Sequence, residues 1–241
     1  MIASTRGIVF HTIPYSDSTV IAKIYTEEFG LRSYLVNAAH SKRSATKARL
    51  LQPLSLVDLV VYEKERSQLQ RVREIRTEVH YQNAHRIEHG SILLFLDEVL
   101  CHVIKEEEKN PLLFEFLHSS LQILDLTRRS SANFHLAFLL QLSKYLGFFP
   151  RGNFSEFCPW FDLPAGEFVP EQPLHPNFLD KRLSDLFCQL MLSSYDENAL
   201  LPIASGERRA LLKNLLFYYS AHMDTFPALK SRAVLEEVLG E

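Results

Sequence analysis

The sequence has few of the residues that metal sites, disulfides and phosphate-binding turns require. Its 241 residues include only three cysteines, Cys101, Cys158 and Cys188, and only eight glycines. An odd number of widely spaced cysteines indicates neither a disulfide framework nor paired zinc ligands, so reduced and mostly buried thiols are expected. No G-x-x-x-x-G-K-[ST], G-x-G-x-x-G or G-x-S-x-G pattern occurs. Nucleotide hydrolysis and serine hydrolase chemistry therefore have no support.

Long apolar runs are also missing. The longest, such as residues 92–96 and 211–216, are far below the roughly 20 residues that cross a bilayer. The N-terminal stretch lacks a basic region followed by a long apolar core and a small-residue cleavage site, so no signal peptide is predicted. We therefore expect no membrane span and a cytoplasmic location.

Charge is spread unevenly along the chain, although the formal net charge is only −3. Residues 1–78 carry 12 Lys+Arg and 8 Asp+Glu, whereas residues 79–241 carry 14 and 21. This asymmetry predicts two modules, of which the first is better suited to a polyanion.

The first 78 residues are typical of β-strands. Five short segments rich in Val, Ile, Tyr and Leu alternate with polar residues and are separated by turn-forming pieces. They cover residues 7–15, 18–30, 31–39, 54–65 and 69–79. Five strands in so short a stretch predict a small closed barrel, because closure removes exposed sheet edges.

After Tyr81 the apolar spacing becomes helical, which predicts an α+β protein of two domains. Helices are expected over residues 86–108, 111–126, 133–147, 178–193, 207–222 and 231–239. Asn110 and Pro111 are typical of an N-cap and first helical residue. Residues 150–177 are rich in Pro, Gly and aromatics without a sustained period, so an irregular insert is expected there. The predicted domains are 1–80 and 81–241.

A basic run is the most prominent candidate for a binding surface. Within residues 38–53, four cations occur without an intervening acidic residue: Lys42, Arg43, Lys47 and Arg49. They lie in the connection between the third and fourth predicted strands, where barrels of this type bind oligonucleotides. The run is a candidate phosphate-binding surface, with a solvated loop as the alternative.

Other strand residues can extend this surface. Arg32 on the third strand and Arg71, Arg73 and Arg76 on the fifth are candidate phosphate contacts. Tyr25 and Tyr34 are candidates for base stacking, but an aromatic residue on a half-buried strand more often belongs to the core.

Two further patterns each have a structural alternative. His85, Glu88 and His89 match the H-x-x-E-H arrangement of some zinc hydrolases, but no third ligand is indicated and the start of a solvated helix is favoured. The segment containing Arg209, Leu212, Lys213 and Leu216 is amphipathic. It suits a core helix with a solvated rim, or a groove for a peptide that ends in hydrophobic residues and carboxylates.

The sequence resembles the bacterial RecO family of recombination mediators. The similarity lies in the turns "YSDS" and "TEEFGLR", in "SKRSATKARLLQP", in "LSKYLGFFP", and in "ALKSRAVLEEVL" near the end of the sequence. The basic run with its "LQP" is the most specific of these matches. The resemblance implies an N-terminal OB-fold barrel, a helical C-terminal domain, and a nucleoid-associated protein.

The family resemblance also implies a function and partners. It implies binding to single- and double-stranded DNA, annealing of complementary strands, partnership with RecR, and help in loading RecA onto DNA coated with the single-strand binding protein SSB. The SSB tail would bind the helical domain, for which we take Arg209, Leu212, Lys213 and Leu216 as candidates. Many members carry four zinc cysteines in the insert, but here only Cys158 is near a ligand position. We therefore expect no metal, no cofactor and no catalytic residue.

An alternative hypothesis is a protein-interaction adaptor that acts mainly through RecR and SSB. It is favoured by the acidic helical half, and it predicts little direct DNA binding. The sequence alone leaves both hypotheses open.

Overall fold

The computed structural model describes residues 1–37, 50–63, 67–83, 85–127 and 129–240. Contacts divide the chain into two compact units: residues 1–84 with 96–125, and residues 85–95 with 126–241. The basic run Lys42, Arg43, Lys47 and Arg49 lies outside the described residues. The first unit includes residues 96–125 as well as the barrel segment, and the predicted domain boundary near residue 80 stays a prediction.

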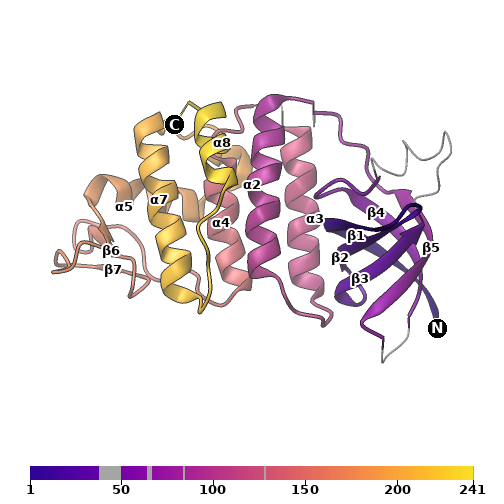
Figure 1. Cartoon of the computed structure of the whole chain (residues 1–241). Coiled ribbons are helices and arrows are strands. Elements are labelled where there is room, and N and C mark those ends of the chain that lie inside the picture. The colour runs from indigo at the N-terminus through magenta and orange to yellow at the C-terminus, as the bar shows by residue number, and fades with distance from the viewer. Residues whose placement is uncertain (38–49, 64–66, 84, 128, 241) are drawn as a thin grey trace. The chain divides into compact units, whose positions relative to one another are not determined.

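The N-terminal strands form a closed five-stranded barrel (Figure 1). They are β1 (Ile2–Ser16), β2 (Thr19–Thr26), β3 (Gly30–Asn37), β4 (Leu56–Tyr62) and β5 (Leu69–Thr77). Their order around the barrel is β1-β2-β3-β5-β4, and only the β3–β5 pair is parallel. This confirms the five-stranded OB-fold expected from the sequence.

The length of β1 lets the barrel close. Its first half pairs with β4 from Ile2 to Ile8, and its second half pairs with β2 from Gly7 to Ser16. The register shifts between Val9 and His11, where an irregularity bends the strand. β1 can therefore pair with β2 along one edge and with β4 along the other, which closes the barrel.

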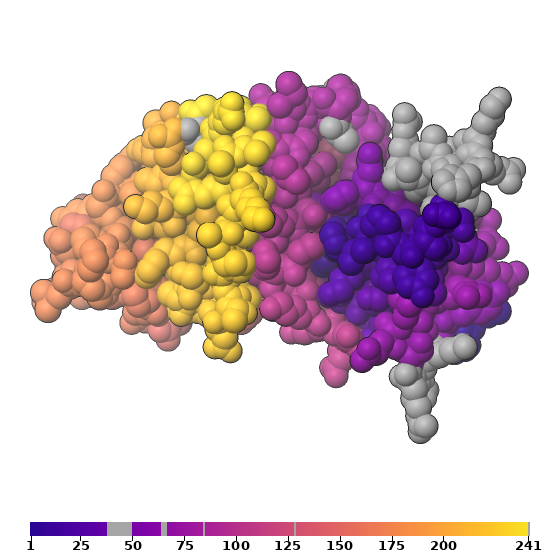
Figure 2. Space-filling view, viewed as in Figure 1, coloured from indigo at the N-terminus to yellow at the C-terminus, as the bar shows by residue number. Residues whose placement is uncertain are grey.

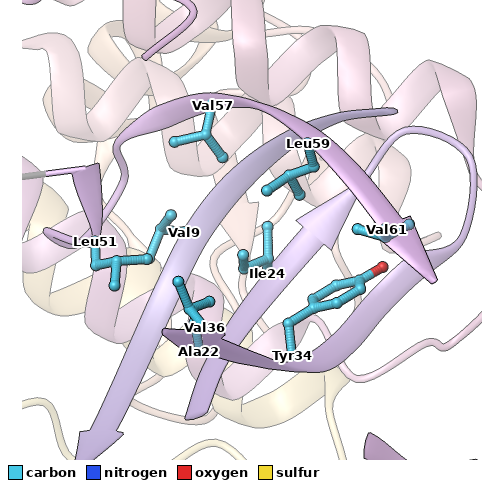
Figure 3. Packing of buried hydrophobic residues seen from close by; sticks show 9 residues of the cluster. All are labelled: Val9, Ala22, Ile24, Tyr34, Val36, Leu51, Val57, Leu59 and Val61. Carbon is cyan, nitrogen blue, oxygen red and sulfur yellow. The ribbon is translucent and has the colours of Figure 1, made fainter. Parts of the chain in front are cut away.

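The barrel interior is filled mainly by branched apolar side chains, together with the ring of Tyr34 (Figure 3). Inward positions alternate along β2, β3 and β4, as the two-residue period of a strand requires. The buried cluster consists of Val9, Ala22, Ile24, Tyr34, Val36, Leu51, Val57, Leu59 and Val61. The barrel is therefore a packed core, and ligands can reach it only from outside.

Within the first unit, α3 (Pro111–Leu126) and the segment that precedes it contact β1, β2 and β3 through Glu115, Phe114 and Glu106. The Asn110 side chain accepts a hydrogen bond from the backbone N–H of Leu113 at 3.1 Å, which confirms the predicted cap. Arg6 of β1 donates to both carboxylate oxygens of Glu27 at 2.8 and 2.9 Å and lies over the ring of Phe114. Arg6 is thus held by partners inside this unit.

Gly30 is required where the β2–β3 turn meets the segment before α3. Its φ is +66°, and a Cβ there would overlap the backbone of Glu108. We expect Gly30→Ala to lower the free energy of unfolding by about 2–3 kcal/mol, from left-handed strain plus overpacking.

Two matched substitutions separate these effects. Gly147 has φ +88° and nothing near its Cβ position, so Gly147→Ala should cost about 1–2 kcal/mol from strain alone. Gly206 in a helix also has open space, and its replacement by Ala should stabilise by up to about 1 kcal/mol. Urea unfolding measures all three. Equal effects of Gly30→Ala and Gly147→Ala would rule out the steric contribution.

The second unit is helical around α4 (Phe134–Tyr145), whose side chains are buried from Phe134 to Leu140. The other helices are α2 (Ile87–Val103), which extends into both units, α5 (Lys181–Leu192), α6 (Tyr195–Asn198), α7 (Ser205–His222) and α8 (Ser231–Val238). Tyr219 of α7 donates a hydrogen bond to the carbonyl of Leu139 at 2.6 Å. The bounds of the longer helices lie within a few residues of those predicted from the sequence.

The insert at residues 150–177 is less irregular than the sequence predicts. It contains β6 (Trp160–Asp162) and β7 (Glu167–Val169), and β8 (Phe178–Leu179) follows it to complete a sheet of order β7-β6-β8. Strands of two or three residues are too short to produce a detectable sequence period. The tight turn at Gly166, with φ +69°, links β6 to β7.

Aromatic packing holds this small sheet on the helices of the second unit. Phe161 of β6 is fully buried, and its ring centroid lies 4.9 Å from Phe168, 4.6 Å from Phe187 and 5.9 Å from Tyr218. Those three residues come from β7, α5 and α7. Phe161 is therefore a central contact between the insert and the helices α5 and α7.

Candidate nucleic-acid interface

The predicted cations of β5 share one outer surface of the barrel. Arg71, Arg73 and Arg76 are all exposed. Glu74 lies among them, 3.1 Å from Arg76 and 4.0 Å from Arg73. Exposed ion pairs of this kind are weak, so both guanidinium groups can exchange a carboxylate for a phosphate at small cost.

Arg32 is placed differently from the β5 arginines. Its guanidinium is 3.0 Å from Glu107 in the segment before α3, and its side chain is only partly exposed. The backbone N–H of the preceding residue, Leu31, donates to the carbonyl of Glu106 at 3.1 Å. Arg32 therefore lies beside a second chain segment that the sequence did not connect with it.

Neither tyrosine proposed for base stacking is exposed. Tyr34 is inside the barrel, with its hydroxyl 3.3 Å from Glu63, and burial raises its pKa above the usual range. Tyr25 is 1% exposed; its ring stacks on Phe10 and lies at a tilt to Phe114, and burial raises its pKa to about 12. Both therefore belong to the core, which was the structural alternative.

Two hollows of about 550 Å³ each lie on the first unit, and their charges differ. The hollow at β1, β4 and β5 is lined by Arg6 and Arg76 but also by three carboxylates, from Glu27, Asp58 and Glu74. The other hollow lies beside β1 to β3. Among the residues that the structure describes, it is lined by His11, Lys23, Arg32 and Lys105 and by one carboxylate, from Glu107. Of the two hollows, this one is better suited to an anion.

Three residues that line this hollow were not predicted from the sequence: His11, Lys23 and Lys105. Lys23 and His11 are paired neighbours on β2 and β1, and Lys105 follows the end of α2. An isolated cation in a strand gives no recognisable signal. Only the tertiary fold brings Lys105, more than 80 positions later in the sequence, next to the strand residues.

On α7, the four candidate residues for a peptide groove divide between surface and core. Arg209 and Lys213 are exposed, Leu216 is half-buried and Leu212 is fully buried. Residues of α7 and α8 form part of an exposed face of the second unit (Figure 2). A docked peptide would therefore touch Arg209, Lys213 and Leu216, with Leu212 supporting them from below.

The H-x-x-E-H histidines point to different environments. His85 is exposed, whereas His89 is 1% exposed within the core. Among the residues that the structure describes, no group of three or more His, Cys, Asp and Glu side chains is placed to hold a metal ion. In the same part of the chain, no helix is long and apolar enough to cross a membrane.

Comparison with known proteins is consistent with this combination of an OB-fold barrel and a helical region. The family model described as "Recombination protein O N terminal" matches residues 1–79, and "Recombination protein O C terminal" matches residues 84–233. "DNA repair protein RecO" of Phocaeicola vulgatus is 36% identical over 99% of both chains. The protein of that name from Flavobacterium psychrophilum is 36% identical over 97% of this chain and 98% of its own.

The fold and these similarities define a class of DNA repair proteins built from an OB-fold barrel and a helical region. A third relative, "DNA repair protein RecO" of Azobacteroides pseudotrichonymphae, is 31% identical over 99% of both chains. The chain belongs to the RecO family.

Proposed function

We propose that this RecO-family protein is a DNA-binding recombination mediator. It binds single- and double-stranded DNA, anneals complementary strands, and acts with RecR to load RecA onto SSB-coated DNA at the nucleoid in the cytoplasm. The proposal rests on four cations, Lys42, Arg43, Lys47 and Arg49, that no acidic residue separates. They lie between β3 and β4 of an OB-fold. Connections between the strands of such barrels are where oligonucleotides bind.

The mechanism is electrostatic and needs no covalent step. Two complementary strands repel each other through their phosphates. A cationic surface that binds both strands lowers this repulsion and raises their encounter rate. The exposed arginines of β5, Arg71, Arg73 and Arg76, extend the same role around the barrel. No residue has to act as a nucleophile, acid or base.

The proposed contact with SSB is the exposed part of α7. The cations Arg209 and Lys213 suit an acidic peptide, and the half-buried Leu216 offers apolar contact beside them. Peptides with mixed acidic and apolar ends bind where cations border an apolar surface. RecR and, indirectly, RecA are proposed partners on the basis of family membership.

Salt dependence of binding tests whether the protein contacts DNA through phosphates. Four phosphate contacts predict that log K for a single-stranded oligonucleotide falls with log salt at a slope near −3, from about 0.7 per contact. Fluorescence anisotropy of a labelled oligothymidylate, titrated at several salt concentrations, gives this slope. The full-length protein is used throughout.

The same titration decides between the mediator and the adaptor. An adaptor would show negligible DNA affinity at physiological salt while it still bound RecR or the SSB tail with micromolar or tighter affinity. A slope close to zero with measurable binding would also contradict the phosphate-contact mechanism.

A further inference from the structure

The basic hollow beside β1 to β3 combines cations with an apolar floor. Its floor is formed by Phe10, Leu31 and Ile104, which are 1%, 8% and 2% exposed. Polar groups of Ser33, Ser67 and Gln68 also line it. A pocket of about 550 Å³ with an apolar floor and a few converging polar groups has the size and lining typical of a small-molecule site.

The charges of this pocket favour an anionic ligand. Lys23 and Lys105 are exposed and line the pocket together with Arg32, whose side chain is partly exposed. Among the described lining residues Glu107 is the one carboxylate, and its side chain is 74% exposed. The other hollow on the same unit has a similar volume but three carboxylates, so volume alone does not distinguish the two.

We propose that this pocket binds one nucleoside monophosphate unit, with the base against Phe10, Leu31 and Ile104 and the phosphate near Lys23, Arg32 and Lys105. The polar side chains of Ser33, Ser67 and Gln68 would meet the edge of the base. The unit can be a free nucleotide or one nucleotide of a DNA strand, because both present the same chemistry. As a subsite for a strand, the inference rests on the proposed DNA-binding function.

The Arg32–Glu107 ion pair gives the proposal a test that only phosphate binding in this pocket would satisfy. The carboxylate of Glu107 lies 3.0 Å from the guanidinium that a phosphate would use. A bound phosphate must therefore compete with Glu107 for Arg32. Removal of that negative charge should tighten binding, a gain that an unfolded variant cannot imitate.

The first measurement compares Glu107→Gln with Glu108→Gln by titration with thymidine 5′-monophosphate. Both variants remove one exposed carboxylate from the same segment, but Glu108 does not line the pocket. Glu107→Gln is expected to bind roughly three- to tenfold more tightly than the wild type, because a close repulsion is removed and Arg32 is released. Glu108→Gln should stay near the wild type. Equal affinities of all three proteins would overturn the proposal.

The second measurement locates the ligand through Cys101, an exposed residue that lines the pocket. Burial raises the pKa of its thiol to about 12, so alkylation is slow and is followed at alkaline pH. At a nucleotide concentration about ten times Kd, alkylation of Cys101 should slow roughly tenfold, because only the free fraction reacts. Cys158 in the insert is the internal control, and its rate should not change. Peptide mass mapping reads both sites in the same sample of full-length wild-type protein.

Three ligands separate the sources of the nucleotide. Protection by thymidine 5′-monophosphate and by an oligothymidylate supports a subsite on the DNA path, and protection by the monophosphate alone supports a free-nucleotide site. Inorganic phosphate or an acidic peptide that protects Cys101 as well as the monophosphate would overturn the assignment to nucleotides. If the oligonucleotide binds but neither it nor the monophosphate protects Cys101, the pocket is not a nucleotide site. The proposed DNA-binding function would then still stand. Failure of the oligonucleotide to bind would refute the proposed function. Protection of Cys101 by the monophosphate would then still show whether the pocket binds a nucleotide.

Discussion

Reversal of Lys42, Arg43, Lys47 and Arg49 to glutamate is expected to abolish annealing of complementary oligonucleotides. The change removes four cations and adds four anions to one chain segment, so the protein would repel both strands. Electrostatic attraction accelerates encounters by about 10- to 1,000-fold, and we expect annealing to slow by roughly 100-fold or more. Annealing is followed by fluorescence quenching between labelled strands at low and physiological salt.

A control with the same change in net charge shows whether position matters. Lys144, Arg151, Lys181 and Lys230 are exposed residues of the second unit. Their reversal to glutamate should slow annealing much less, because long-range repulsion is screened beyond about 10 Å at 0.1 M salt.

The salt slope of the basic-run variant gives a second readout. Its slope should become less steep by about 3, since each of the four lost phosphate contacts contributes about 0.7. An unchanged annealing rate in the basic-run variant would refute the assignment of DNA binding to residues 42–49. Equal losses in both quadruple variants would show that net charge, not this run, drives annealing.

Replacement of Phe161 by alanine is expected to have the largest effect on stability. The fully buried ring joins β7, α5 and α7, and the backbone N–H of Phe161 donates to Ser184 at 3.0 Å. Loss of a buried phenylalanine costs about 3–5 kcal/mol in transfer and cavity terms. For a chain of this size each kcal/mol lowers Tm by about 2–4 °C, so a drop of roughly 10 °C is expected. Differential scanning calorimetry measures it.

Phe157 supplies the matched control for this stability effect. It lies in the same insert but is 85% exposed, so Phe157→Ala should change stability by less than about 0.5 kcal/mol. A chelator should leave Tm unchanged, because the insert holds a single cysteine and depends on aromatic packing. A Tm that falls on addition of EDTA, or that is insensitive to Phe161→Ala, would contradict this account.

Most of the architecture was predictable because it follows local rules. Alternation along β2 to β4 indicated the strands, and the Asn110 and Pro111 pair marked the start of α3. The strands of the insert were missed because β6 and β7 are too short for a period to be visible. Tyr25 illustrates a different limit: alternation shows that it faces away from the barrel core, but only the packing of Phe114 on it shows that it is buried.

The sequence by itself determined the helical and strand segments, the likeness to RecO proteins and the basic run, because propensity, period and charge clusters are properties of neighbouring residues. The tertiary structure decided which cations share a pocket. Lys23 and Lys105 line the same hollow only because the segment after α2 folds back on β2 and β3. It also decided that Arg32 faces Glu107. Burial and charge pairing arise from contacts between distant parts of the chain, so they cannot be predicted from a pattern of neighbouring residues.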